Sequence, residues 1–169
     1  SNSQSVWLGE NAVLDVSGVA LTNPLAAPVW NGSTLYSPNT GKVLPGGSVA
    51  IADDSGYIVA QQGSVINVSG TSAVFDQLGA NGRYAATPTW SDAGSITLAG
   101  SSGLYFDGAV KGQGGAPQAE GGTLTLSTDG GNGTRYRADG TKVQVPGPTA
   151  IVLQQSGELV PQGLTLGQD

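Results

Sequence analysis

Asp53 and Asp54 are the only two adjacent carboxylates in this chain of 169 residues. Paired carboxylates are the side chains with which many enzymes perform acid–base chemistry on sugars. The chain offers few other reactive groups, because it contains no His and no Cys. The commonest general base, a thiolate nucleophile and a Cys-based zinc site are therefore excluded.

The internal repeat described below argues against a catalytic role for this pair. At an offset of 47 residues, Asp53 and Asp54 correspond to Gly100 and Ser101, and Asp107 corresponds to Ala60. Carboxylates are thus not expected to line up from one repeat to the next. A lyase also needs a basic side chain near the sugar, and Lys111 alone lies in a predicted repeat strand. We expect a solvated turn at this pair, no catalytic residues and no enzyme.

No metal or cofactor site is expected either. The stretch 129–133 partly matches a Gly- and Asp-rich calcium repeat, but it occurs once, and Arg135 follows where a ligand Asp would be needed. A glycine-rich turn is the simpler interpretation. The Asn-x-Ser/Thr sequences at Asn31, Asn67 and Asn132 are common in a Ser- and Thr-rich chain, and they leave glycosylation open.

The elements that would have to position any site are short strands. The stretch 47–70 contains three apolar runs of four residues, each closed by a small or polar corner, which is typical of strands and too short for helices. The unit recurs along the chain. An offset of 47 residues relates Gly47–Ala52 to Gly94–Ala99, and the same offset relates Gly56–Val59 to Gly103–Phe106. An offset of 52 residues relates Ile58–Gly70 to Val6–Gly18. Gly122–Leu126 is a partial fourth copy. Such periods predict a solenoid.

Two long stretches interrupt the repeat at the same place, directly after Val-Ser-Gly. Residues 19–45 and 71–92 lose the strand pattern and carry closely spaced turn signals, so they are interpreted as loop insertions. In the third copy the corresponding link, 115–121, is short. Insertions at one corner of successive coils project from one edge, so we expect the two to pack on each other and form a shared surface.

Four aromatic residues in these insertions are the candidate contact residues for a ligand or partner: Trp30, Tyr36, Tyr84 and Trp90. They have two interpretations. They either attach the insertions to the side of the solenoid, or form a patch that stacks on sugars or contacts a protein.

A third insertion is expected at 128–147, closing as a hairpin in which 134–138 faces 142–145 across Asp139-Gly140. Residues 150–155, AIVLQQ, are similar to YIVAQQ at 57–62, so the chain is expected to re-enter the solenoid there.

Composition excludes further classes of function. Charged residues make up 11% of the chain and the net charge is −6, which disfavours binding to nucleic acid. No apolar run is long enough to span a membrane, and no charged-then-apolar leader opens the sequence. The sequence is expected to be a piece of a longer protein.

The segments VWLGENAVLDVSG, GGSVAIADDSGYIVAQQGSVINVSG and DAGSITLAGSSGLYFDGAVKGQGG are similar to the interior of large filamentous-haemagglutinin-like exoproteins of Gram-negative bacteria. The resemblance covers most of the chain outside the insertions. It implies export by two-partner secretion through an outer-membrane transporter barrel, a secreted or cell-surface location, and a role as an adhesin or as a stalk.

The expected fold is all-β, a right-handed parallel β-helix with extra-helical loop insertions, formed by residues 1–169 as a single segment of a larger exoprotein. The expected function is a non-catalytic stalk whose loops form a binding surface for a glycan or protein on a host or neighbouring cell. The alternative is a carbohydrate-active enzyme resembling a polysaccharide lyase or hydrolase. The interior is expected to contain Leu14, Val16, Ile66, Val68, Ile96, Leu98, Leu124 and Leu126.

Overall fold

The computed structural model describes residues 5–54, 56–128 and 133–145, and for 133–136 and 145 it describes the backbone alone. Within these ranges every helix or strand assigned is a β-strand. No helix there is long and apolar enough to cross a membrane. The expectation of an all-β chain is therefore confirmed for the described part.

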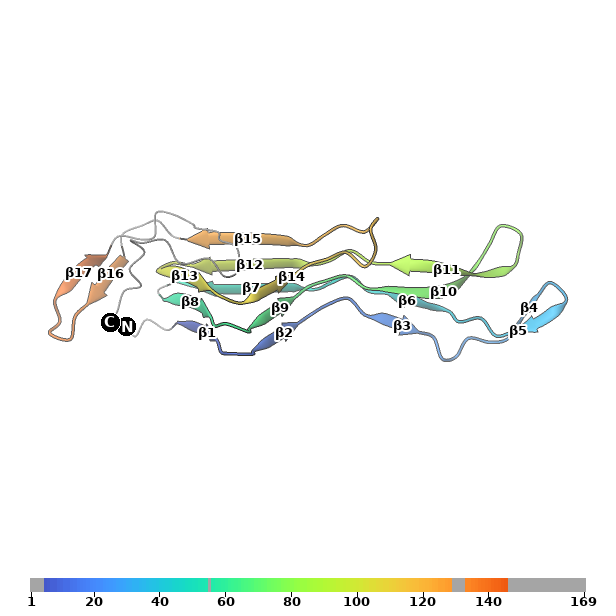
Figure 1. Cartoon of the computed structure of the whole chain (residues 1–169), viewed down its shortest axis with the longest axis horizontal. Helices are drawn as coiled ribbons and strands as arrows, with labels where there is room; N and C mark the ends of the chain where they lie inside the picture. The colour runs from blue at the N-terminus through green and yellow to red at the C-terminus, as the bar shows by residue number, and fades with distance from the viewer. Residues whose placement is uncertain (1–4, 55, 129–132, 146–169) are drawn as a thin grey trace.

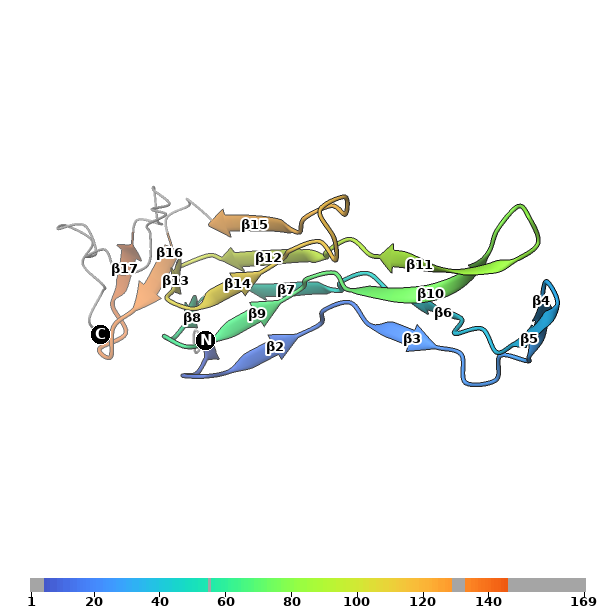
Figure 2. The same ribbon diagram turned by 45° about the vertical axis from the view of Figure 1, so that its right-hand side comes forward.

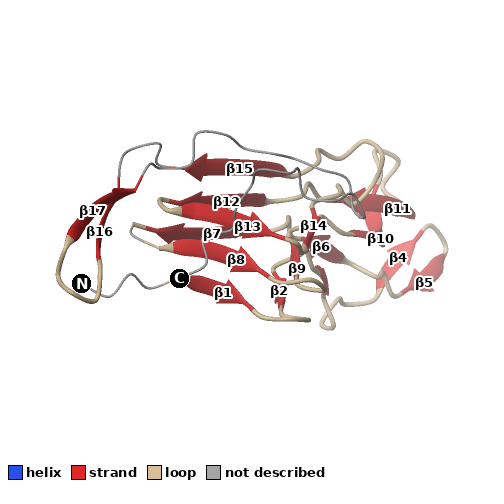
Figure 3. Cartoon of the chain, turned by 60° about the vertical axis from the view of Figure 1, so that its left-hand side comes forward, coloured by secondary structure: helices blue, strands red, loops and turns tan. Residues whose placement is uncertain are grey.

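The body of the molecule consists of three stacks of parallel strands (Figure 3). The first stack contains β1 (Val6–Leu8), β8 (Tyr57–Ala60) and β13 (Gly103–Phe106), the second contains β2 (Val13–Asp15), β9 (Val65–Asn67) and β14 (Ala109–Lys111), and the third contains β7 (Ser48–Asp53), β12 (Ser95–Gly100) and β15 (Thr123–Thr128). The chain visits the stacks in turn, so coil 1 is β1, β2 and β7, coil 2 is β8, β9 and β12, and coil 3 is β13, β14 and β15. This is a β-helix-like solenoid, as the repeat predicted.

The predicted register is correct in the third stack and between β1 and β8 of the first stack, and it is wrong by one residue between β8 and β13. Ser48 pairs with Ser95 at the predicted offset, but Ile58 pairs with Leu104 and not with Tyr105. Three residues connect β7 to β8, whereas two connect β12 to β13. The shorter corner keeps Leu104 packed against the core, since a slip of one residue would turn the opposite face of the strand inward. For the same reason Ala60 pairs with Phe106 and not with Asp107, which is the next residue along the chain.

The hydrophobic core lies mainly in coil 2. Ile58, Ile66, Val68, Ile96 and Leu98 are fully buried, and they include four of the predicted interior residues. Two further predicted residues, Leu14 and Leu126, pack against this cluster from the coils on either side.

The remaining two predicted interior residues are not buried. Val16 in coil 1 is 39% exposed and Leu124 in coil 3 is 45% exposed. Leu124 pairs with the buried Ile96, so it occupies an inner position of the repeat. Because strands of coils 1 and 3 have a strand neighbour on one side only within the described residues, their inner side chains are only partly covered.

Glycine is required where successive coils turn the corner together. The amide of Gly94 donates a 2.7 Å hydrogen bond to the carbonyl of Val68. A Cβ atom on Gly94 would overlap the carbonyl oxygen of Gly47 in the coil below. The high glycine content thus allows the backbones of neighbouring coils to approach closely at this corner.

The two long insertions are ordered ribbons, and the expectation that they are loops is wrong. Tight turns explain why these stretches form paired strands. Gly32 and Gly82, each preceded by Asn, adopt positive φ angles and reverse the chain between the strands of a pair. The first insertion contains β3 (Ala20–Thr22), β4 (Val29–Asn31), β5 (Thr34–Tyr36) and β6 (Gly41–Val43), and the second contains β10 (Ser72–Leu78) and β11 (Tyr84–Trp90), with antiparallel pairs β3–β6, β4–β5 and β10–β11.

The predicted hairpin of the third insertion is confirmed. Strand β16 (Gly133–Tyr136) pairs antiparallel with β17 (Lys142–Val145), and Gly140 has a positive φ of 84° in the turn. The hairpin lies at the opposite end of the molecule from the two long insertions (Figure 1). The predicted return of 150–155 to the solenoid falls outside the described residues.

Candidate functional site

The candidate site is built on the corner between the second and third stacks. Both long insertions leave the solenoid after the second-stack strand and return before the third-stack strand. Their bases are joined by backbone hydrogen bonds from Gly18 to Ser69 (2.7 Å) and from Gly46 to Asp92 (3.0 Å). We call the two insertions together, residues 19–45 and 71–92, the insertion lobe. It extends to one side of the solenoid (Figure 1).

A carboxylate buried inside the lobe connects the two insertions. Asp76 on β10 is only 8% exposed. Its Oδ2 accepts a 2.8 Å hydrogen bond from the Tyr36 hydroxyl and a 2.7 Å hydrogen bond from the backbone amide of Asn39. The backbone amide of Asp76 in turn donates to the carbonyl of Asn39 at 2.8 Å. A buried carboxylate with this many hydrogen-bond partners has a structural role, because it joins the two insertions.

The contact with Asp76 makes the Tyr36 hydroxyl a weaker acid. The hydrogen bond that it donates to Asp76 raises the pKa of Tyr36, and partial burial and the negative charge of Asp76 act in the same direction. Ionised Tyr36 would lose the proton that it donates and would place a second negative charge beside the first.

A second contact fixes the outer end of the lobe. The Asn31 side chain accepts a hydrogen bond from the backbone amide of Tyr84 and donates one to its carbonyl, both at 3.1 Å. This pairing imitates a β-ladder rung between the β4–β5 turn and the start of β11. The Arg83 side chain lies against Gly32 in the same turn. The tips of the two insertions are therefore held side by side, as expected from their common corner.

Apolar packing completes the lobe. Phe75, next to Asp76 on β10, is 4% exposed, and its ring fills the space beside the backbone of Gly41 on β6. Pro38 is buried as well. The lobe thus has a small core of its own, which is expected of an ordered insertion and not of a slack loop.

The structure separates the four candidate aromatic residues into two pairs. Tyr36 and Tyr84 are half-buried and take part in the contacts between insertions. Trp30 is 69% exposed and Trp90 is 41% exposed. Trp90 pairs with Ser72 at the base of the β10–β11 ribbon, whereas Trp30 lies at the tip of the lobe in the β4–β5 hairpin (Figure 2). The two tryptophans are therefore at opposite ends and do not form one patch.

Trp30 has an apolar neighbour at the tip. It pairs directly with Leu35 across the β4–β5 ribbon, so both side chains lie on one face, and Leu35 is also exposed. An indole ring and a leucine side chain thus form a small outward-facing apolar surface on the β4–β5 ribbon.

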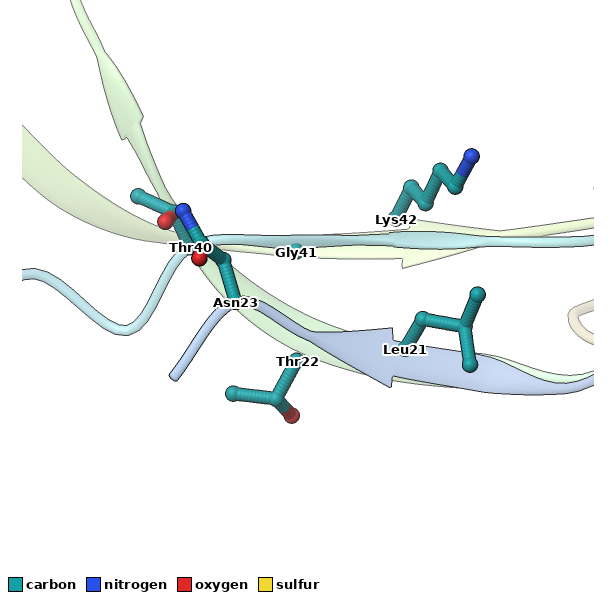
Figure 4. Close-up of a pocket in the computed structure, with 6 residues that line it drawn as sticks. All are labelled: Leu21, Thr22, Asn23, Thr40, Gly41 and Lys42. Atoms are coloured by element: carbon teal, nitrogen blue, oxygen red, sulfur yellow. The ribbon is translucent and has the colours of Figure 1, made fainter. Parts of the chain in front are cut away.

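A shallow hollow of about 360 Å³ lies over the β3–β6 ribbon (Figure 4). Its walls are short side chains and the half-exposed Leu21, and Lys42 is the one charged residue that lines it. Asn23 and Thr40 lie next to each other at one end, where the backbone amide of Asn23 donates to the carbonyl of Thr40 at 2.7 Å. The hollow has few groups that could orient a ligand.

A second open hollow, of about 390 Å³, lies at the corner that follows the third stack, and Asp53 and Asp54 line it with Ser101, Ser127 and Thr128. One Asp53 oxygen accepts a 2.5 Å hydrogen bond from the amide of Gly56, as in a turn. In register, Asp53 pairs with Gly100, so no carboxylate lies above it in coil 2, as predicted.

Two further carboxylates of the coils, Asp92 and Asp107, lie elsewhere. Asp107 follows the first-stack strand β13, Asp92 precedes the third-stack strand β12, and the Asp53–Asp54 pair lies at the end of the third-stack strand β7. They therefore occupy three different corners of the solenoid. Among the described residues no group of three or more His, Cys, Asp or Glu side chains could hold a metal ion. The Gly- and Asp-rich stretch 129–132 lies outside those residues.

The aligned strands of the second stack carry a row of polar side chains, one from each coil. Asp15, Asn67 and Lys111 are directly in register, one per coil. The Asn67 amide donates to Asp15 at 3.3 Å. The Ser17 hydroxyl and backbone amide lower the pKa of Asp15, and Asn67 and Lys111 add to this effect. Asn31 and Asn67 thus both use their amides in contacts within the protein, and Asn132 is not among the described residues.

Sequence reasoning missed the two residues that organise the lobe, Asp76 and Asn39. A polar residue within an apolar strand segment, Val74-Phe75-Asp76, was the available signal for a buried and partnered carboxylate. The paired strands could have been found from the Asn-Gly dipeptides at 31–32 and 81–82, each flanked by apolar or β-branched residues.

No family model matches the chain, and neither a curated protein nor a solved structure matches it.

Proposed function

We propose that the chain is a right-handed parallel β-helical segment of a large secreted or surface-exposed bacterial adhesin, in which the coils form a stalk and the insertion lobe is the binding surface. The segment is non-catalytic. In this proposal the parent protein resembles the filamentous-haemagglutinin-like exoproteins and passes through an outer-membrane transporter barrel. The partner of the lobe is a glycan or a protein on a host or neighbouring cell.

The observation that carries the proposal is the ordered lobe itself. The two insertions, which leave adjacent coils, are joined by the buried Asp76 carboxylate and by the Asn31–Tyr84 contact. Coil 3 closes the same corner with a short link, in which Gly122 donates directly to the carbonyl of Gly112. A stalk does not need the lobe in order to close its coils, so the extra folded chain is best explained by recognition.

The tip of the lobe suits a neutral, sugar-like ligand. Trp30 is the most exposed aromatic residue there, and Leu35 extends the apolar surface beside it. Sugar rings present apolar C–H faces that stack on indole, while hydroxyl groups bond to neutral polar side chains. Asp76 is buried within the lobe, and Arg83 is the one charged residue in the two turns at the tip, 29–36 and 79–84, so binding should depend little on salt.

The enzyme alternative rests on the hollow at Asp53 and Asp54. Against it, Asp107, Asp92 and the Asp53–Asp54 pair occupy three different corners, and Lys111 lies on a strand of another stack. The favoured role of the Asp53–Asp54 pair is to cap a turn.

The proposal is tested by replacing Trp30 and measuring binding to bacterial and host cells and to an array of glycans. Trp7 on β1 provides the matched control, because it is similarly exposed, at 61%, but lies on the coils. Trp30→Ala should reduce binding at least about tenfold while Trp7→Ala leaves it unchanged, and the residual signal should be similar at low and high salt. Equal effects of the two substitutions, or no effect of either, would contradict the assignment of binding to the lobe.

A further inference from the structure

Two Asn-Gly pairs lie in the turns at the tip of the insertion lobe, Asn31-Gly32 and Asn81-Gly82. In an Asn-Gly pair the backbone nitrogen of glycine can attack the side-chain amide of asparagine, because glycine has no side chain that obstructs the approach. Both glycines are exposed to water. The third Asn-Gly pair of the chain, at 132–133, begins outside the described residues. The tip therefore contains two candidate sites for the same reaction.

The two turns differ in the attacking nitrogen. The Gly82 amide donates a 2.9 Å hydrogen bond to the carbonyl of Gly79. The Gly32 amide donates to no partner in the described part of the chain. The attack requires this amide to lose its proton, and a hydrogen bond to a carbonyl makes that loss more costly. The nitrogen beside Asn31 is therefore available for reaction, whereas the nitrogen beside Asn81 is held.

The carbonyl that is attacked is polarised in both turns. The side-chain oxygen of Asn31 accepts a 3.1 Å hydrogen bond from the Tyr84 amide, and that of Asn81 accepts a 3.0 Å hydrogen bond from the Arg83 amide. Each donor stabilises the negative charge that develops on this oxygen during the attack. In addition, the Arg83 side chain lies against Gly32, where its positive charge favours the deprotonated nitrogen. The turns are thus alike in the electrophile, and the state of the nitrogen decides between them.

From these observations we infer that Asn31 is a site of spontaneous deamidation, and that the reaction separates the tips of the two insertions. The Gly32 nitrogen forms a bond to Cγ of Asn31, and the bond from Cγ to Nδ2 breaks, so that Nδ2 leaves as ammonia. The product is a five-membered cyclic imide. Water opens it at either of its two carbonyl groups, which leaves aspartate or isoaspartate at position 31. One water is consumed, one ammonia is released, and nothing is oxidised or reduced.

The reaction removes a group that joins the two insertions. Nδ2 of Asn31 donates a 3.1 Å hydrogen bond to the Tyr84 carbonyl, and the product has a carboxylate oxygen in its place. Two acceptors then face each other without a proton between them. Isoaspartate also adds a carbon atom to the main chain in the β4–β5 turn, directly after Trp30. Since the reaction does not reverse, the change persists. The inference concerns the turn and does not depend on the function proposed for the lobe.

Peptide mass spectrometry of the full chain tests the choice of site. The folded protein and the protein in denaturant are kept at mildly alkaline pH and digested after lysine, since cleavage at Lys42 separates Asn31 from Asn81. In denaturant both sites should react at similar rates, because both are Asn-Gly. In the folded protein Asn31 should react at least about fivefold faster than Asn81, the usual effect of one backbone hydrogen bond. Equal rates in the folded protein, or faster reaction at Asn81, would overturn the choice of site.

Amide hydrogen exchange tests the consequence. The product carries one more negative charge, so ion exchange separates it from the unreacted protein, and fractions changed at position 31 alone are identified by their peptides. Exchange in these fractions should be faster at Tyr84 and across β4 and β5 than in unreacted protein. Exchange at β8, β9 and β12 should be unchanged, which serves as the internal control. Unchanged exchange at the tip, or faster exchange throughout the coils, would contradict a local separation of the two insertions.

Discussion

The hydroxyl of Tyr36 donates a 2.8 Å hydrogen bond to the carboxylate of Asp76, which lies 40 residues further along the chain and on the other insertion. Together with the Asn39 amide, this contact turns two separate excursions into one folded unit. The stability of the lobe should therefore depend on Asp76 more than on any surface residue.

Asp76→Ala should loosen the lobe without unfolding the coils. The substitution leaves the Tyr36 hydroxyl and the Asn39 amide without their acceptor inside the protein, at a cost of about 2 kcal/mol or more. Amide hydrogen exchange should accelerate at Asn39 and across β10 while the amides of β8, β9 and β12 stay protected. Asp76→Asn is the matched control, because it keeps an acceptor oxygen in nearly the same place. Uniform acceleration across lobe and coils would mean that the two regions unfold together.

Alkaline pH should weaken the lobe through Tyr36. Its pKa is raised in the folded protein by the hydrogen bond to Asp76, so the folded state retains the phenolic proton more tightly than the unfolded state. The corresponding stabilisation is fully present below the unfolded pKa of about 10 and is lost as pH rises through the higher folded value.

Thermal melts of the wild type and of Tyr36→Phe, followed from about pH 8 to pH 11, provide the measurement. The difference in melting temperature between the two proteins should shrink as pH rises through the upper part of this range. A difference that is constant with pH would show that Tyr36 ionisation is not linked to folding.

The inner face of coil 2 should not tolerate charge. Val68→Asp buries an unpaired carboxylate in the core, at a cost of several kcal/mol, and this is a large part of a typical stability of about 5 to 15 kcal/mol. We expect the protein to unfold or to melt at a much lower temperature. Val16→Asp, at the half-exposed counterpart in coil 1, should lower the stability less. Asn67→Ala and Asp53→Asn should leave any binding activity unchanged. Measured melting temperatures that rank Val16→Asp below Val68→Asp would contradict the placement of the core.

Close contact between coils makes one corner glycine sensitive to a single methyl group. In Gly94→Ala the new Cβ overlaps the Gly47 carbonyl oxygen, so the backbones of coils 1 and 2 must separate. Gly121→Ala provides the control, because the nearest atom, the Gly112 carbonyl oxygen, lies 3.6 Å from the added Cβ. Circular dichroism and thermal melts should show a large loss of stability for the first and little change for the second. Similar behaviour of both variants would show that the corner can relax.

The sequence predicted the coils because each inner strand repeats an apolar residue at every second position and ends at a small corner. The sequence pattern alone thus identifies Ile66, Val68, Ile96 and Leu98 as core residues, and all four are fully buried. It did not predict the register of β13, because one residue fewer in the preceding corner shifts the strand, and a glycine-rich corner does not reveal its own length. Val16 and Leu124 were placed in the interior because the repeat pattern is the same in every coil, whereas burial depends on the presence of a neighbour on both sides.

The lobe was predicted in position but not in structure. Its common corner and the contact between its halves follow from the place at which the repeat is interrupted. Its strands were missed because Pro, Gly and Asn suggested loops, although Asn-Gly pairs also form tight hairpin turns. The Tyr36–Asp76 contact could not be predicted, since it depends on how two ribbons from different coils are laid against each other.

The central claim is that the insertion lobe, and not the coils, recognises a partner. It is tested most directly by replacing both insertions, residues 19–45 and 71–92, with short links copied from coil 3, and by measuring binding of the intact and shortened proteins to cells and glycans. The account predicts that the shortened protein keeps its β-sheet circular dichroism and cooperative melting but loses binding. A folded, shortened protein that binds as well as the intact one would contradict the account and would show that the lobe has no part in binding.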